Sequence, residues 1–95
     1  MRITQYEKNV IIYAVNEIDA TANIWLFGSR NDDNKKGGDI DIGILSQKID
    51  VMEEIKIKQM ICDKIGEQKI DIVVSKDGQE TFFKHVVANG LLLNG

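Results

Sequence analysis

The feature that most constrains the fold is a strand-like run, Asp-Ile-Asp-Ile-Gly-Ile-Leu, at residues 39–45. Side chains of a strand alternate between its two faces, so Asp39 and Asp41 are expected to share one face while the isoleucines occupy the other. Two carboxylates about 5 Å apart repel by roughly 3 kcal/mol at an effective dielectric of about 20. A neutralising cation is therefore expected, and Mg²⁺, which binds a few carboxylates together with phosphate oxygens, fits the pattern best.

Length and composition predict a single small domain spanning residues 1–95. The chain is 43% hydrophobic and 28% charged, which is ordinary for a globular domain. The net charge is −3, so the chain lacks the basic surface that extended binding to nucleic acid requires, and no direct nucleic-acid binding is expected. One cysteine, Cys62, excludes an intrachain disulfide and fits a reducing compartment. Because the start does not resemble a signal peptide and no apolar run has the length of a membrane span, we expect a cytoplasmic location.

Apolar periodicity predicts an α/β or α+β domain with a small mixed sheet and the element order αββαβα. Helices are expected at about 5–20, 51–65 and 79–89. Strands are expected at 24–27, 39–45 and 69–75. The apolar segment 91–93 that follows fits either a short edge strand or a packing tail.

Local signals mark where the helices begin. Thr4 with Glu7, and Asp50 with Glu53, have the spacing of a capping residue and its partner three positions later. Asp77 is expected to cap the third helix.

A third carboxylate lies in another apolar strand, Ile-Asp-Ile-Val-Val at residues 70–74. One helix joins this strand to the Asp39–Asp41 strand, and consecutive elements usually lie side by side. If the two strands pair, Asp71 approaches Asp39 and Asp41, and the three carboxylates can hold one or two divalent ions. The alternative for Asp71 is a surface position on an edge strand.

A Gly-Ser turn follows the first expected strand, about ten residues before the aspartates. Gly28 allows a sharp turn and the close approach of a ligand. Ser29 offers a hydroxyl and a backbone N–H, both suited to phosphate. Arg30 fits a phosphate contact about as well as an ordinary solvated position.

These three segments together resemble the minimal nucleotidyltransferase (MNT) family of the DNA polymerase β-like nucleotidyltransferase superfamily. The segments are Leu-Phe-Gly-Ser-Arg at 26–30, Gly-Asp-Ile-Asp-Ile at 38–42 and Ile-Asp-Ile-Val-Val at 70–74. The similarity extends from the first helix to the 90–92 tail. The larger relatives carry further domains that read the base and the acceptor. Because residues 1–95 are expected to form a single domain without these parts, a partner is expected to complete the substrate pocket.

The resemblance implies a mechanism. Asp39, Asp41 and Asp71 would be the catalytic and Mg²⁺-binding residues, with Asp71 helping to activate the acceptor hydroxyl. Gly28 and Ser29 would hold the β- and γ-phosphates of a nucleoside triphosphate such as ATP, which loses pyrophosphate. Similar proteins act as antitoxins beside an all-helical HEPN protein, and some transfer AMP to a tyrosine of that HEPN ribonuclease.

Three functions remain open at this point. The first is Mg²⁺-dependent transfer of AMP to a hydroxyl of a HEPN partner in a two-gene toxin–antitoxin module. The second is a non-catalytic binding module that neutralises a HEPN partner by contact, which gives no physical reason for clustered carboxylates. The third is a transferase acting on a small molecule, which the absence of an acceptor-binding domain disfavours.

The partner surface is expected near the C-terminus. Phe82, Phe83 and the leucines at 91–93 offer more apolar surface than a small core requires, and exposed apolar patches commonly mark interfaces. The alternative is that all of them pack against the sheet.

Overall fold

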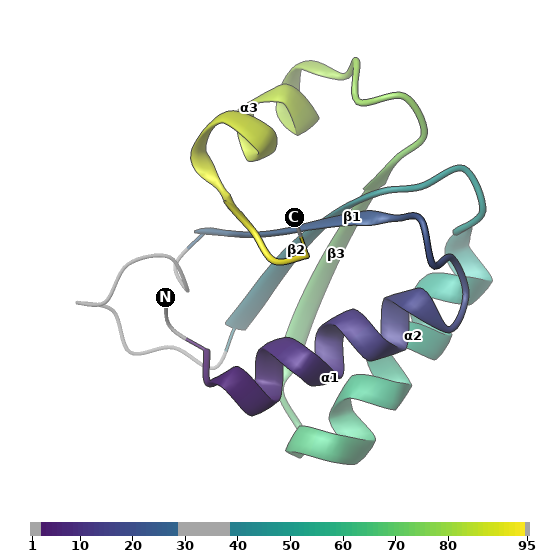
Figure 1. Cartoon of the computed structure of the whole chain (residues 1–95), viewed down its shortest axis with the longest axis vertical. Coiled ribbons are helices and arrows are strands. Elements are labelled where there is room, and N and C mark those ends of the chain that lie inside the picture. Colours follow the sequence, from purple (N-terminus) through teal and green to yellow (C-terminus); the bar gives the residue numbers. More distant parts are fainter. Residues whose placement is uncertain (1–2, 29–38, 95) are drawn as a thin grey trace.

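The computed structural model of the chain describes residues 3–28 and 39–94. It contains a four-stranded mixed sheet with helices on both faces (Figure 1). The elements are α1 (Gln5–Asn16), β1 (Asn23–Phe27), β2 (Asp39–Leu45), α2 (Val51–Ile65), β3 (Lys69–Ser75), α3 (Thr81–Asn89) and β4 (Leu91–Leu92). The strand order is β3-β2-β1-β4, with β2 and β3 parallel and the other two pairs antiparallel. The predicted α/β class, mixed sheet and αββαβα order are therefore confirmed.

The core lies between one face of the sheet and the helix pair α1–α2. Ile40, Ile42 and Ile44 alternate along β2 and are completely buried, as the strand pattern predicts. They meet buried side chains from β1 and from both helices, including Ile11, Val15, Ile24, Leu26, Ile57 and Ile61. Full burial of each such side chain contributes about 1.5–3 kcal/mol, so this face supplies most of the driving force for folding.

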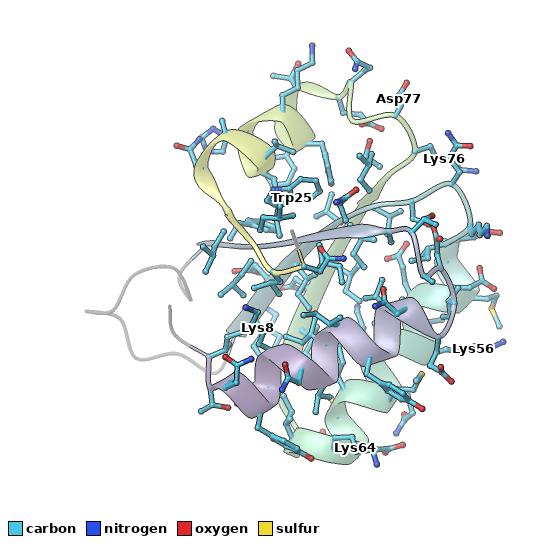
Figure 2. The ribbon with its side chains drawn as sticks, in the orientation of Figure 1. Lys8, Trp25, Lys56, Lys64, Lys76 and Asp77 are labelled. Carbon is cyan, nitrogen blue, oxygen red and sulfur yellow. The ribbon has the colours of Figure 1, made fainter. Side chains whose placement is uncertain are left out.

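Among the described elements, α3 covers the opposite face of the sheet, and it covers that face only in part. Trp25 of β1 lies between the sheet and α3 (Figure 2) and meets Phe83 edge to face, with ring centroids 5.7 Å apart. The helix can approach because β2 carries Gly43 beneath it. A Cβ at Gly43 would lie 2.7 Å from Val86 Cγ1, closer than real side chains approach.

The capping predictions for α1 and α2 are confirmed. Glu7 N–H donates to Thr4 Oγ1, and Thr4 N–H donates to Glu7 Oε1 in return. Asp50 N–H likewise donates to Glu53 Oε1 at 2.9 Å. α2 ends at Gly66, whose positive φ of 92° suits a glycine after a helix.

Two predicted helix ends are wrong. α1 stops at Asn16 rather than near residue 20, because Asp19 turns the chain: its Oδ1 accepts from the backbone N–H of Thr21. α3 begins at Thr81 rather than 79. Asp77 does not cap it but accepts from Gln79 N–H in a local turn that precedes the helix.

The tail forms a short edge strand and also packs, so both expectations for residues 91–93 hold. Leu91 and Leu92 pair with β1, and Leu93 is buried. Asn94 then bonds both the N–H of Ile24 and the carbonyl of Ala22. The tail thereby supplies hydrogen-bond partners for backbone groups along the outer edge of β1.

Asp19 joins the α1–β1 loop to the β2–α2 loop, at the end of the sheet where β1 begins and β2 ends. It is only 3% exposed, and Ser46 Oγ donates to its Oδ2 at 2.6 Å while Thr21 Oγ1 donates to Oδ1 at 2.7 Å. The Ser46 hydroxyl, followed by that of Thr21, holds the pKa of Asp19 below its ordinary value.

We expect Asp19→Ala to lower the free energy of unfolding at neutral pH by about 2 kcal/mol, because hydrogen bonds to a charged acceptor contribute about 1.5–3 kcal/mol. A depressed folded-state pKa stabilises above the unfolded value near 3.9, and this stabilisation disappears as the pH falls through the folded pKa. Urea denaturation should therefore show the gap between wild type and variant narrowing below about pH 4. Glu17→Ala, which removes an exposed carboxylate from the same segment, is the control. A pH-independent gap would contradict this account.

Candidate functional site

A row of three side chains crosses the part of the α3 face over which no described helix lies. Asp41 pairs with Asp71 across the parallel β2–β3 ladder and with Phe27 across the antiparallel β1–β2 ladder. Residues paired in register project to the same face, so the order across the sheet is Asp71, Asp41, Phe27. Asp41 and Asp71 are both half-buried. The prediction that Asp71 lies on the strand beside Asp41 is confirmed.

Gly28 brings the backbone against Asp41. It follows the end of β1 with a φ of +74°, which L side chains rarely adopt. A Cβ at this position would overlap Asp41 Oδ2 and lie 3.0 Å from its Cγ. The glycine is therefore required both for the turn and for the space that the carboxylate occupies.

The remaining predicted site residues are described in part or not at all. Asp39 begins β2 and its backbone pairs with Lys69, but its side chain lies outside the described part of the structure. Ser29 and Arg30 also lie outside the described residues. Metal binding by Asp39, Asp41 and Asp71 together therefore stays a prediction, as do phosphate contacts by Ser29 and Arg30.

The described residues fit a divalent cation in chemistry. Across residues 3–28 and 39–94, no three described carboxylate, imidazole or thiol side chains gather into a metal cluster. The pair Asp41 and Asp71 nevertheless supplies two hard oxygen donors from adjacent strands. Mg²⁺ is usually held by one or two carboxylates together with substrate phosphates, so this pair fits it.

The row lies beside α3 rather than beneath it. Gly43, two residues after Asp41 on the same face, lies under α3: a Cβ added there would be 2.7 Å from Val86 Cγ1 and 3.4 Å from Phe83 Cε1. Phe82, in the first turn of α3, meets Phe27 edge to face with centroids 5.8 Å apart. The helix thus forms one wall of the site. Of the expected C-terminal apolar groups, Phe83 and Leu93 pack inside, whereas Phe82, Leu91 and Leu92 are exposed.

A separate hollow of about 400 Å³ lies between α1 and α2, on the opposite side of the sheet from the carboxylates. Tyr6, Tyr13 and Met60 contribute to its lining, together with Asp63 and Lys64. Asp63 is the single carboxylate of this lining, so the hollow lacks the paired carboxylates of the Asp41–Asp71 row.

Sequence reasoning missed the part that Phe27 plays in the site. The prediction treated it as the last residue of a buried apolar run, but it belongs to the row that contains Asp41. The available signal was alternation: Ile24 and Leu26 face the core, which puts Phe27 on the other face.

Comparison with known proteins agrees with this geometry. A family model described as polymerase beta nucleotidyltransferase matches residues 8–94. No curated protein matches the chain significantly. None of the described helices is long and apolar enough to cross a membrane.

Solved structures share the fold. A toxin–antitoxin crystal structure with AMP-PNP superposes with a TM-score of 0.75 at 24% identity, over 93% of this chain and 73% of the other. The crystal structure of the toxin–antitoxin MntA-HepT superposes with a TM-score of 0.71 at 23% identity, over 97% of this chain and 73% of the other. The structure of a tri-AMPylated Shewanella oneidensis HEPN toxin in complex with MNT antitoxin superposes with a TM-score of 0.73 at 24% identity, over 98% of this chain and 73% of the other. Because the family model covers residues 8–94, this chain belongs to the polymerase beta nucleotidyltransferase family and is a nucleotidyltransferase domain.

Proposed function

We propose that this domain transfers AMP from ATP to a hydroxyl group of a HEPN protein, and so acts as the antitoxin of a toxin–antitoxin pair. The observation that carries the proposal is the pairing of Asp41 with Asp71 on adjacent strands, beside a glycine turn that touches Asp41. Two neighbouring carboxylates on a largely apolar sheet repel each other and so destabilise the fold. A domain that only binds a partner gains nothing from them in return. They are useful where a phosphoryl group is transferred.

The similar solved structures support the choice of nucleotide and acceptor. One contains AMP-PNP, an ATP analogue, and another contains a HEPN toxin that carries AMP. By analogy, we propose ATP as the nucleotide and a HEPN protein as the acceptor for this chain.

In the proposed reaction, the acceptor hydroxyl attacks the α-phosphorus of ATP. Its oxygen forms the new phosphorus–oxygen bond, and Asp71 accepts the hydroxyl proton. The bond from the α-phosphorus to the oxygen shared with the β-phosphate breaks, and pyrophosphate leaves with the electron pair. The Gly28–Ser29 turn holds the β- and γ-phosphates through backbone N–H groups and the Ser29 hydroxyl.

Mg²⁺ fits the same residues. Asp39, Asp41 and Asp71 would hold it, and when bound it neutralises charge on the phosphates and orients them. With the carboxylates neutralised in this way, their mutual repulsion no longer opposes the binding of an anionic nucleotide.

We expect the chain to form a specific complex with a HEPN protein and to add one or more AMP units to it. The test is co-expression with the product of the adjacent gene, followed by intact-mass measurement of that partner after incubation with ATP and Mg²⁺. A mass gain of whole AMP units, with release of pyrophosphate, is the expected result. EDTA should abolish it.

Other outcomes separate the alternatives. A stable complex with no mass gain on the partner contradicts the transfer reaction and leaves the non-catalytic binding module. The absence of both complex and modification contradicts both, and leaves transfer to a small molecule.

A further inference from the structure

Phe82 occupies an unusual position for an exposed aromatic side chain. It is 53% exposed, although it lies in the first turn of α3, beside the carboxylate row. A large apolar ring in this position contributes little to the core, because Phe83 and Val86 already make the buried contacts of this helix.

The contacts of Phe82 place it across the site. On one side it meets Phe27 of β1 edge to face. On the other side it lines a hollow of about 200 Å³ together with Val73 of β3. β2, which carries Asp41, runs between β1 and β3, so Phe82 spans the strand that carries the carboxylate.

The hollow beneath Phe82 is next to Asp71 along the strand. Val73 follows Asp71 by two residues and lies on the same face. The rest of the lining comes from Val74, Ser75, Glu80 and Phe83. The Ser75 hydroxyl donates to Glu80 Oε1 and accepts from Gly78 N–H, which fixes the polar end of the hollow.

We propose that Phe82 is the base-positioning residue of this domain, and that the nucleobase of the bound triphosphate stacks on its exposed ring at the hollow between α3 and β3. This inference rests on the proposed function, because it requires the phosphates to bind at the Gly28–Asp41 end of the row. Phe27 holds the Phe82 ring in place through the edge-to-face contact, so that the ring is oriented before the base arrives.

Stacking on an aromatic ring suits a site with few groups available for base recognition. Each base stacked on an aromatic side chain gains affinity that alanine substitution removes, about 5- to 140-fold in the dissociation constant. The described lining otherwise offers the base mainly apolar contacts and the Ser75–Glu80 pair.

The test compares two ligands that share the phosphates but not the base: ATP and inorganic tripolyphosphate, each titrated calorimetrically with Mg²⁺ into the purified chain. Phe82→Ala should weaken ATP binding by about tenfold and leave tripolyphosphate binding unchanged. Phe82→Trp, which keeps an aromatic face, should retain ATP affinity. Tyr13→Ala is the matched control, since Tyr13 is similarly exposed but lies on α1, beyond the opposite face of the sheet.

The outcomes separate this inference from the proposed function. If wild type binds ATP more tightly than tripolyphosphate and Phe82→Ala affects neither, or weakens both equally, base stacking on Phe82 is wrong while the nucleotide site stands. If Phe82→Ala weakens only the complex with the protein partner, Phe82 is a docking residue and the inference is overturned. If wild type binds neither ligand, the proposed function and the inference both fail.

Discussion

Replacing Asp39 and Asp41 together by asparagine should lower nucleotidyl transfer at least about a thousandfold, which is about 4 kcal/mol of transition-state stabilisation. The substitution keeps the size and strand geometry of both side chains but removes the negative charge that would hold Mg²⁺. Without metal, the melting temperature should stay unchanged or rise slightly, because two like charges on one strand no longer repel.

The assay for this variant is AMP transfer with labelled ATP, read beside thermal melting in EDTA. Asp77→Asn is the matched control: Asp77 is an exposed aspartate in the β3–α3 loop, and asparagine retains the oxygen that accepts from Gln79 N–H. Full activity of the double variant would show that the chemistry lies elsewhere in the molecule.

Gly28→Ala should reduce transfer by about a hundredfold, more than its effect on stability explains. Its Cβ would overlap the Asp41 carboxylate and so displace a group whose position sets the reaction geometry. Misplacement of a reacting group by about 1 Å can cost roughly a hundredfold in rate. The positive φ of 74° adds strain of about 1–2 kcal/mol.

Gly66→Ala separates strain from overlap. Gly66 has a similar positive φ of 92°, but a Cβ there meets no atom within 4 Å. Both variants should lose stability in urea denaturation, Gly28→Ala at least as much as Gly66→Ala because of the added overlap, and only Gly28→Ala should lose most of its transfer activity. Equal activity losses in the two variants would show that backbone strain alone is responsible.

Local signals in the sequence predicted the two strands that carry the candidate metal-binding carboxylates. Apolar runs predicted β2 and β3 with their bounds, and the two-residue spacing predicts that Asp39 and Asp41 share one face. The parallel register that sets Asp41 opposite Asp71 was not predictable, because it depends on how α2 packs against the core. The position of Phe82 above Phe27 was equally hidden, since it depends on how α3 crosses the sheet over Gly43.

The errors also have physical causes. Asp19 appeared to be an ordinary residue near the end of a helix, but its partner Ser46 is 27 positions away in the sequence. The start of α3 shifted because Gly78 and the Ser75 hydroxyl form a turn first. Periodicity reports only which residues can be helical, whereas the hydrogen bonds of the adjoining turns, such as those of Asp19 and Ser75, decide where a helix begins or ends.

The claim that the Asp41–Asp71 row is the metal and nucleotide site is tested most directly by NMR of the amide-labelled chain. Mn²⁺, which accepts the same oxygen ligands as Mg²⁺ and broadens nearby signals, is titrated in with a non-hydrolysable ATP analogue. The amide signals of Gly28, Asp41 and Asp71 should broaden first, while those of Lys76 and Asp77, beyond the far end of β3, persist. The double variant Asp39→Asn with Asp41→Asn should abolish this selectivity. Uniform broadening near every exposed carboxylate, or first broadening around Asp19, would contradict the assignment of the site.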